Sequence, residues 1–182
     1  MTTLTLLVIC VVAMAVAVVV FGVFPMTHAY FKYRGQRLIT CPETLHSEAV
    51  RVAAGKAAVG AFVGEPALRL DQCSRWPERH DCGQECLRQI EADPDKCLVW
   101  NIVSKWYEHQ SCVYCHRRLG PLHHLDHVPA LMGPDRKTIE WDRLQPQQLP
   151  EVFSTYKPVC WNCHITESFR QEHPELVVER QR

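Results

Sequence analysis

The sequence predicts an α+β protein made of one membrane-spanning helix and two small cysteine-containing parts. Three observations lead to this fold class: an uncharged apolar run near the N-terminus, 10 cysteines among 182 residues, and two CxxC pairs in the last part of the chain. We place an anchor and its basic flank at 1–36, a cysteine-rich α+β region at 37–110 and a metal-binding module at 111–182. With 20 basic and 20 acidic residues the formal net charge is zero, which argues against charge-driven binding of nucleic acid.

The apolar run covers residues 4–24 without a single charged side chain. A helix of that length at 1.5 Å per residue extends about 31 Å, which matches the hydrocarbon core of a bilayer. The alternatives are a buried core helix and a cleaved signal peptide. The run has almost no polar face, the N-terminus has no basic residue, and Phe24-Pro25-Met26 is a poor cleavage site. We therefore predict an uncleaved, single-pass membrane anchor.

The flanks of this run predict its orientation. No Lys or Arg precedes it, whereas Lys32, Arg34 and Arg37 follow it closely. Basic flanks tend to remain on the cytoplasmic side of a membrane, so we expect the bulk of the chain in the cytoplasm. The alternative is exposure on the periplasmic face, where the cysteines would meet an oxidising environment.

The region 37–110 alternates between strand and helix patterns. In chain order we expect a strand at 38–40, a strand at 49–52, a short helix at 53–63, a strand at 68–70 and a helix from Asp93-Pro94 onward. Asp as N-cap and Pro in the first turn are typical of a helix start. Apolar residues at helical spacing from Leu98 to Tyr107 then predict one buried face.

The same region contains Cys41 and a closer group of cysteines that forms a possible second metal site: Cys73, Cys82, Cys86 and Cys97. In an oxidising compartment two disulfides are the natural interpretation of this group. In the cytoplasm such cysteines are metal ligands, small buried side chains or reactive thiols. The spacing alone leaves these alternatives open.

Two CxxC pairs predict a zinc site in the C-terminal part. Cys112-x-x-Cys115 and Cys160-x-x-Cys163 are separated by 44 residues. Each tight turn presents two thiolates to one point, and two such pairs complete a tetrahedral Zn²⁺ site. A structural zinc also compensates for a small apolar core, because its binding free energy becomes folding free energy.

A histidine follows each pair directly, and this predicts an alternative cofactor. The runs Cys112-Val-Tyr-Cys115-His116 and Cys160-Trp-Asn-Cys163-His164 resemble c-type haem attachment sites, in which the thiols bond the haem and the histidine becomes an axial ligand. That resemblance implies a membrane-anchored dihaem electron-transfer protein. The candidate distal ligands are His109, His123, His124, His127 and Met132. The predicted cytoplasmic orientation argues against this alternative.

The segment between the pairs contains His123-His124-Leu-Asp126-His127-Val-Pro129. Together with both CxxC pairs, this order resembles the HNH, or ββα-metal, treble-clef module over about residues 112–170. The resemblance implies a treble-clef-like fold with a structural zinc on the four cysteines. It also implies Asp126 as a catalytic-metal ligand, His127 as the general base and His164 as a further metal or phosphate contact.

The chain departs from that family in two respects. HNH nucleases have an Asn shortly before the second CxxC pair, and here the run Phe153-Ser-Thr-Tyr-Lys-Pro158 has none. From residue 112 onward the chain has nine basic and nine acidic residues, so phosphate backbones meet no cation excess. We therefore favour a zinc-binding accessory subunit of a larger membrane complex over an enzyme. A dihaem cytochrome and a tethered nuclease are the alternatives, and we expect no nucleic-acid partner.

Overall fold

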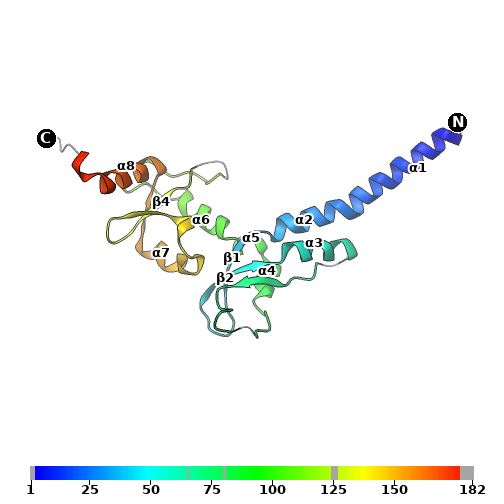
Figure 1. Cartoon of the computed structure of the whole chain (residues 1–182), viewed down its shortest axis with the longest axis horizontal. Helices are drawn as coiled ribbons and strands as arrows, with labels where there is room; N and C mark the ends of the chain where they lie inside the picture. The colour runs from blue at the N-terminus through cyan, green and yellow to red at the C-terminus, as the bar shows by residue number, and fades with distance from the viewer. Residues whose placement is uncertain (1–2, 65, 80, 124–126, 177–182) are drawn as a thin grey trace. The chain divides into compact units, whose positions relative to one another are not determined.

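The computed structural model describes residues 3–64, 66–79, 81–123 and 127–176, and the chain divides into two compact units, Met1–Leu98 and Val99–Arg182 (Figure 1). The first unit contains α1 (Thr3–Val18), η1 (Val19–Val23), α2 (Phe24–Tyr33), β1 (Gln36–Thr40), β2 (Ser47–Val52), α3 (Ala54–Val63), β3 (Leu70–Cys73), α4 (Leu87–Ala92) and α5 (Pro94–Cys97). The second contains α6 (Val99–Glu108), β4 (Ala130–Met132), β5 (Thr138–Glu140), η2 (Trp141–Arg143), η3 (Pro146–Gln148), α7 (Leu149–Thr155), β6 (Lys157–Val159), α8 (Trp161–Glu172) and η4 (Pro174–Leu176). The expected mixture of α and β structure is confirmed.

The elements α1, η1 and α2 continue into one another as a 31-residue helix, Thr3–Tyr33, which is long and apolar enough to cross a membrane. Only 6% of its most apolar window is buried, which distinguishes it from the core helix of a globular domain. The π-helical turn η1 lies directly before Pro25. Proline lacks an N–H and crowds the carbonyl four residues earlier, so the wider turn lets the helix pass Pro25 without ending.

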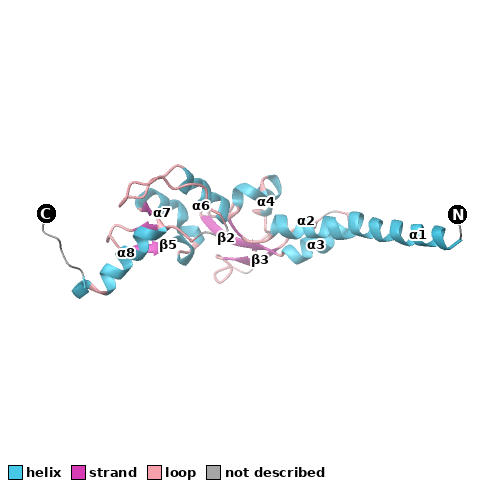
Figure 2. Ribbon diagram, turned by 90° about the horizontal axis from the view of Figure 1, so that it is seen from above, coloured by secondary structure: helices cyan, strands magenta, loops and turns pink. Residues whose placement is uncertain are grey.

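One short helix packs along the end of this long helix. Helix α3 lies along α2, as both views show (Figure 2). A Cβ atom added to Gly22 would lie 2.9 Å from the ring of Phe62, so glycine permits the close approach of η1 and the end of α3. The predicted helix at 53–63 is thereby confirmed, beginning at Ala54.

The sheet of the first unit has the strand order β1-β2-β3, with both outer strands antiparallel to β2. Leu38 pairs with Ala49, and Val50 pairs with Cys73. The strands predicted at 38–40 and 49–52 are confirmed. The third strand begins at Leu70 and runs on to Cys73, later than the predicted 68–70, because the pairing with β2 starts only where Val52 meets Leu70.

Arg37 is the buried charged residue at the centre of the first unit, with 1% of its surface exposed. Its Nη2 donates to the backbone carbonyl of Lys32 at 2.5 Å, and its Nη1 donates to the carbonyl of Pro94. The last carbonyls of a helix have no partner within the helix, so Arg37 satisfies one of them at the end of α2. Arg37, counted from the sequence among the basic residues of the flank, is therefore a buried link between β1, α2 and α5.

The helix predicted from Asp93 onward is interrupted. Asp93 does cap a helix, because its side chain accepts from the backbone N–H of Lys96 at 3.2 Å. That helix, α5, ends at Cys97, and Leu98 adopts an extended conformation and pairs with Arg37. The helical pattern resumes as α6, whose buried residues Val99, Val103 and Tyr107 confirm the predicted apolar face.

Helix α6 belongs to the second unit, although the sequence grouping placed it in the region 37–110. The reason is packing: Tyr107 is fully buried and its hydroxyl donates to the carbonyl of Ala130 at 2.9 Å. The sheet of this unit has the order β5-β4-β6, and Ala130 pairs with Glu140 on one side and Val159 on the other. Ala130, Val159 and Cys112 are completely buried and form its small core.

Candidate metal centre

The first cysteine pair lies on a tight loop closed at its base. Ser111 and Arg118 form an isolated β-bridge, and the N–H of Cys112 donates to the carbonyl of Arg117 at 2.9 Å. His116 has a φ of 56°, so the chain turns back through a left-handed residue directly after Cys115. The backbone of the loop is joined to β6, because the N–H of Val113 donates to the carbonyl of Pro158 at 3.0 Å. The fold therefore holds the first pair beside the strand that leads to the second pair.

The second pair begins α8. Cys160 is the N-cap residue in an extended conformation, and its carbonyl accepts from the N–H of His164 at 2.9 Å. Cys163 lies in the first helical turn, on the same side as the Cys160 sulfur. The side chains of Cys160 and Cys163 pack against the core around Cys112.

The two pairs converge. The sulfurs of Cys112, Cys115, Cys160 and Cys163 all lie within 4.8 Å of one another. Within the described ranges this is the one group of three or more cysteine, histidine or carboxylate side chains at such spacing. The Cys115 and Cys160 sulfurs are 3.7 Å apart. Tetrahedral zinc with Zn–S bonds of about 2.3 Å separates its sulfurs by about 3.8 Å, so the arrangement fits a metal ion such as zinc.

The four thiols share their protons unequally. Burial acts to raise the pKa of Cys112, but the backbone N–H groups of Cys115, Cys160 and Tyr114 donate to its sulfur and lower the pKa to about 7. Burial and then the neighbouring thiols raise the pKa of Cys163, and burial raises that of Cys160. Negative charge thus collects on the Cys112 sulfur. A cation bound among the four sulfurs would take the place of the protons that Cys160 and Cys163 hold.

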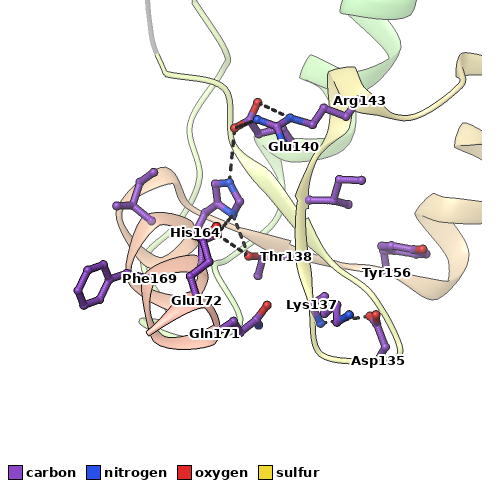
Figure 3. A pocket seen from close by; sticks show the side chains of 13 residues that line it. Asp135, Lys137, Thr138, Glu140, Arg143, Tyr156, His164, Phe169, Gln171 and Glu172 are labelled. Atoms are coloured by element: carbon purple, nitrogen blue, oxygen red, sulfur yellow. Dashed lines mark hydrogen bonds and ion pairs between the residues drawn. The ribbon is translucent and has the colours of Figure 1, made fainter. Parts of the chain in front are cut away.

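His164 lies on α8 beside this cluster and is buried. Its Nδ1 is 2.8 Å from the hydroxyl of Thr138, and its Nε2 is 3.5 Å from a carboxylate oxygen of Glu140 (Figure 3). Glu140 is also 3.4 Å from Arg143. These residues line an open pocket of about 700 Å³ between β5 and α8. Both ring nitrogens of His164 therefore already have protein partners.

The other histidines of the predicted sites lie elsewhere. His127 is exposed, and its ring stacks on Trp161 with 4.8 Å between centroids. His116 and His123 are also exposed. Asp126, the metal ligand implied by the HNH resemblance, lies outside the described residues. The structure therefore brings the four predicted zinc ligands together and places the rings of both His127 and His164 against Trp161.

The second candidate group of cysteines lies in the first unit. The sulfurs of Cys73, Cys82, Cys86 and Cys97 are not among those that gather at metal-binding spacing in the described residues. The Cys97 thiol instead donates to the carbonyl of Gln89 at 3.7 Å, and the charged groups that act on it are Arg37 and Asp93.

Sequence reasoning missed two residues of the pocket, Thr138 and Glu140. They are two positions apart on β5, and residues two apart on a strand share one face. The polar residues at alternate positions of Thr-Ile-Glu could have indicated this face. Their contacts with His164 could not have been inferred from the sequence pattern, because these contacts join segments that are distant in the chain.

Comparison of the chain with protein-family models, with curated proteins and with solved structures gave no match.

Proposed function

We propose that this chain is a membrane-anchored zinc protein that acts as a binding, or accessory, subunit of a larger membrane complex. The proposal depends chiefly on one observation, the convergence of four cysteine sulfurs within 4.8 Å. Structural zinc sites use four protein ligands, whereas catalytic zinc sites leave one position for water. A set of four cysteines therefore favours a metal that stabilises the module rather than one that reacts.

The long helix Thr3–Tyr33 supports the anchor. Lys32 and Arg34 at its C-terminal end favour a cytoplasmic position for the rest of the chain. A reducing compartment keeps thiols available for metal, and all ten cysteines are free thiols in the structure. The anchor, the orientation and the zinc site are thus mutually consistent.

The geometry favours zinc over two covalent haems. Two CxxCH motifs in a dihaem protein each bind a separate porphyrin, so their sulfurs must lie far apart. Here Cys115 of one motif and Cys160 of the other are 3.7 Å apart. Met132, a candidate distal ligand, instead accepts from the hydroxyl of Tyr114 at 3.1 Å.

The order of elements supports a treble-clef-like module without nuclease activity. A cysteine loop, the β4–β5 hairpin and a helix that starts at the second pair follow one another as the HNH resemblance implies. The candidate base His127 packs flat on Trp161, however, and the nitrogens of His164 face Thr138 and Glu140. We therefore propose that the module retains the zinc scaffold and serves binding.

We assign the binding surface to the exposed face of α8 beside the pocket. Ile165 and Phe169 are one helical turn apart, and about half of each side chain is exposed. Figure 3 shows Phe169 on the outer side of α8, pointing away from His164. Adjacent exposed apolar side chains next to a polar pocket are typical of a partner surface.

The test uses the full chain, purified from native membranes in mild detergent. We expect at least one zinc per chain, and we expect the chain to migrate with a distinct partner, well above its own 21.0 kDa, on a native gel. Phe169→Glu should release the partner without loss of zinc, because Phe169 is exposed and is not a ligand. Gln148→Glu, which adds the same charge at another exposed position, is the matched control.

A chain that migrates alone, or a complex that withstands Phe169→Glu and Ile165→Glu together, would contradict the accessory role. A Soret band that persists after denaturation would instead establish the dihaem alternative, because covalent haem remains attached to the unfolded chain.

A further inference from the structure

A pocket of about 460 Å³ lies in the first unit, at the end of the long helix. Its walls come from the last turn of α2, the turn at Gly35, the end of β2, the first turn of α3 and one residue of β3. The N–H of Arg34 donates to the carbonyl of Tyr30 at 2.9 Å and closes the last turn of α2. The N–H of Ala53 donates to the carbonyl of Arg69 at 2.9 Å and joins the start of α3 to the segment that leads into β3. Backbone contacts therefore fix both sides of the pocket.

Basic side chains dominate the lining. Arg34, Arg51 and Lys56 are exposed and line the pocket together with Asp71, so these lining residues have a formal net charge of +2. None of the four forms an ion pair within the part of the chain that the structure describes. By contrast, Arg75 of the same unit pairs with a glutamate at 2.7 Å. The positive charge of the pocket is therefore available to a ligand.

The first turn of α3 adds backbone donors to the same pocket. The first N–H groups of a helix have no carbonyl partner within the helix, and they give its N-terminal end a partial positive charge. The N-cap residue Ala53 has no side-chain acceptor for them. Gly55 lines the pocket, and a Cβ atom added to it would meet nothing within 4 Å, so there is open space beside this backbone. An anion in the pocket would thus meet N–H groups as well as basic side chains.

The pocket lies at the membrane surface when the long helix spans a bilayer. Tyr30 follows Phe24, the end of the apolar run, by six residues, which is about 9 Å along a helix. The headgroup layer is about 5–8 Å thick on each side of the hydrocarbon core, so the pocket opens at its outer edge. Helix α3 gives the same height, because Phe62 near its end lies against Gly22, whereas its first turn lines the pocket with Tyr30.

Phosphate is the anion that fits this lining. A guanidinium binds two phosphate oxygens in parallel, and a lysine ammonium adds a point charge. The guanidinium of Arg34 lies over the ring of Phe31 at 4.5 Å, which orients the group and leaves its N–H edge open for such contacts. The volume of the pocket is that of a small-ligand site. Because the cytoplasmic leaflet contains anionic phospholipids, the membrane around the anchor itself supplies the ligand.

We propose that this pocket binds the phosphate group of an anionic phospholipid from the leaflet that surrounds the anchor. Arg34, Arg51 and Lys56 bind the phosphate oxygens, and the first turn of α3 faces the same group. The bound lipid links α2, β2 and α3 to one another at the membrane surface. The proposal rests on the membrane anchor of the proposed function and is independent of the zinc centre and of the accessory role.

Native mass spectrometry of the full chain tests the proposal. The chain is reconstituted into nanodiscs with equal amounts of phosphatidylglycerol and phosphatidylcholine and then extracted into mild detergent, and the lipids that remain bound are counted. We expect one phosphatidylglycerol to remain in preference to phosphatidylcholine. Arg51→Gln and Lys56→Gln should each lower this preference about fivefold, which is the contribution of one basic residue near an anionic membrane surface. These two positions are changed in place of Arg34, whose charge also affects the orientation of the anchor.

Matched variants separate the pocket from the total charge of the chain. Arg88→Gln and Lys105→Gln remove the same charges at exposed positions outside the pocket and should leave the preference unchanged. Arg51→Lys combined with Lys56→Arg keeps both charges and should retain the preference, which distinguishes loss of charge from local unfolding. Glycerol 3-phosphate in large excess should not displace the lipid, because it lacks the acyl chains that keep the headgroup beside the pocket.

Equal retention of the two lipids by the wild-type chain would overturn the proposal, and so would an equal loss of preference in Arg88→Gln and Arg51→Gln. Displacement of the lipid by glycerol 3-phosphate would make the pocket a site for soluble phosphate esters and overturn its assignment to a lipid. A chain that fails to enter nanodiscs would refute the anchor of the proposed function and this proposal with it. A chain that inserts without lipid preference would refute this proposal alone.

Discussion

The imidazole of His127 lies flat on the indole of Trp161, with 4.8 Å between the ring centroids and 9° between the ring planes. The ring of Trp161 is in turn 5.7 Å from that of His164. The rings of both histidines thus contact Trp161, the first residue of α8. In this arrangement His127 contributes packing surface, whereas a general base must direct a ring nitrogen at a substrate proton.

We expect no nuclease activity from the purified chain. Supercoiled plasmid and single-stranded DNA should remain intact with Mg²⁺, Mn²⁺, Ni²⁺ or Zn²⁺, as judged by gel electrophoresis. His127→Ala should lower the stability of the second unit by about 1 kcal/mol through loss of the stacked pair. His123→Ala, at another exposed histidine of the same segment, should leave stability unchanged. Metal-dependent nicking that His127→Ala abolishes would establish the tethered nuclease instead.

Zinc binding at the metal centre should weaken as the pH falls. The pKa of Cys112 in the folded, metal-free chain is lowered from 9.0 to about 7, so its thiolate stabilises the fold fully above about pH 9, and this contribution is lost as the pH falls through about 7. Protons also compete with zinc for the other sulfurs, so we expect release below about pH 5.5. A chromophoric chelator measures the released ion, and circular dichroism should show loss of structure over the same range. Retention of the zinc at pH 4 would contradict this mechanism.

Tyr107→Phe should destabilise the second unit by about 1–2 kcal/mol, because the buried carbonyl of Ala130 loses its hydroxyl donor. Trp106 packs edge-on against Tyr107 with 4.9 Å between centroids, so tryptophan fluorescence during urea unfolding measures the effect. Tyr114→Phe is the control, since that hydroxyl is exposed and donates to the thioether sulfur of Met132. Equal effects of the two variants would mean that burial of the hydroxyl is unimportant.

Arg37→Lys should destabilise the first unit by about 2–4 kcal/mol. A single ammonium group cannot reach both carbonyls that the guanidinium binds, those of Lys32 and Pro94, and one of them is left without its donor. Thermal unfolding in detergent measures the loss. Arg51→Lys, at an exposed arginine on the neighbouring strand, should have no effect. A tolerated Arg37→Lys would indicate that water replaces the guanidinium.

The predicted orientation can be tested with protease. A tag at the C-terminus should resist protease added outside intact cells and become sensitive after permeabilisation. Lys32→Glu together with Arg34→Glu should reduce this protection, because the basic flank that retains the chain in the cytoplasm is removed. Cleavage of the tag on intact wild-type cells would place the cysteines in an oxidising compartment and favour disulfides among Cys73, Cys82, Cys86 and Cys97.

Features that depend on neighbouring residues in the chain were predictable. The apolar run, the strands around Leu38 and Val50, and the N-cap at Asp93 all follow from local pattern, and the structure has each of them. The two CxxC pairs belong to the same class, because each loop presents two sulfurs by its own geometry. Their meeting at one point was inferred from ligand chemistry and is confirmed by the spacing of the sulfurs.

Features that depend on tertiary contacts were not predictable from pattern. The helix break at Leu98 arises because this residue pairs with Arg37 on a distant strand. The partners of His164, Thr138 and Glu140, come from another element in the same way.

The contact between Gly22 and Phe62 limits how the first unit can move. With Thr3–Tyr33 in a bilayer, Gly22 lies near the end of the hydrocarbon layer, and the tip of α3 reaches the same depth with Val59 and Phe62 exposed to the surrounding lipid. Only two residues separate α2 from β1. With its long helix in a bilayer, the unit would have no tether on which to leave the surface, and a partner of this unit would meet it there, by a search in two dimensions instead of three.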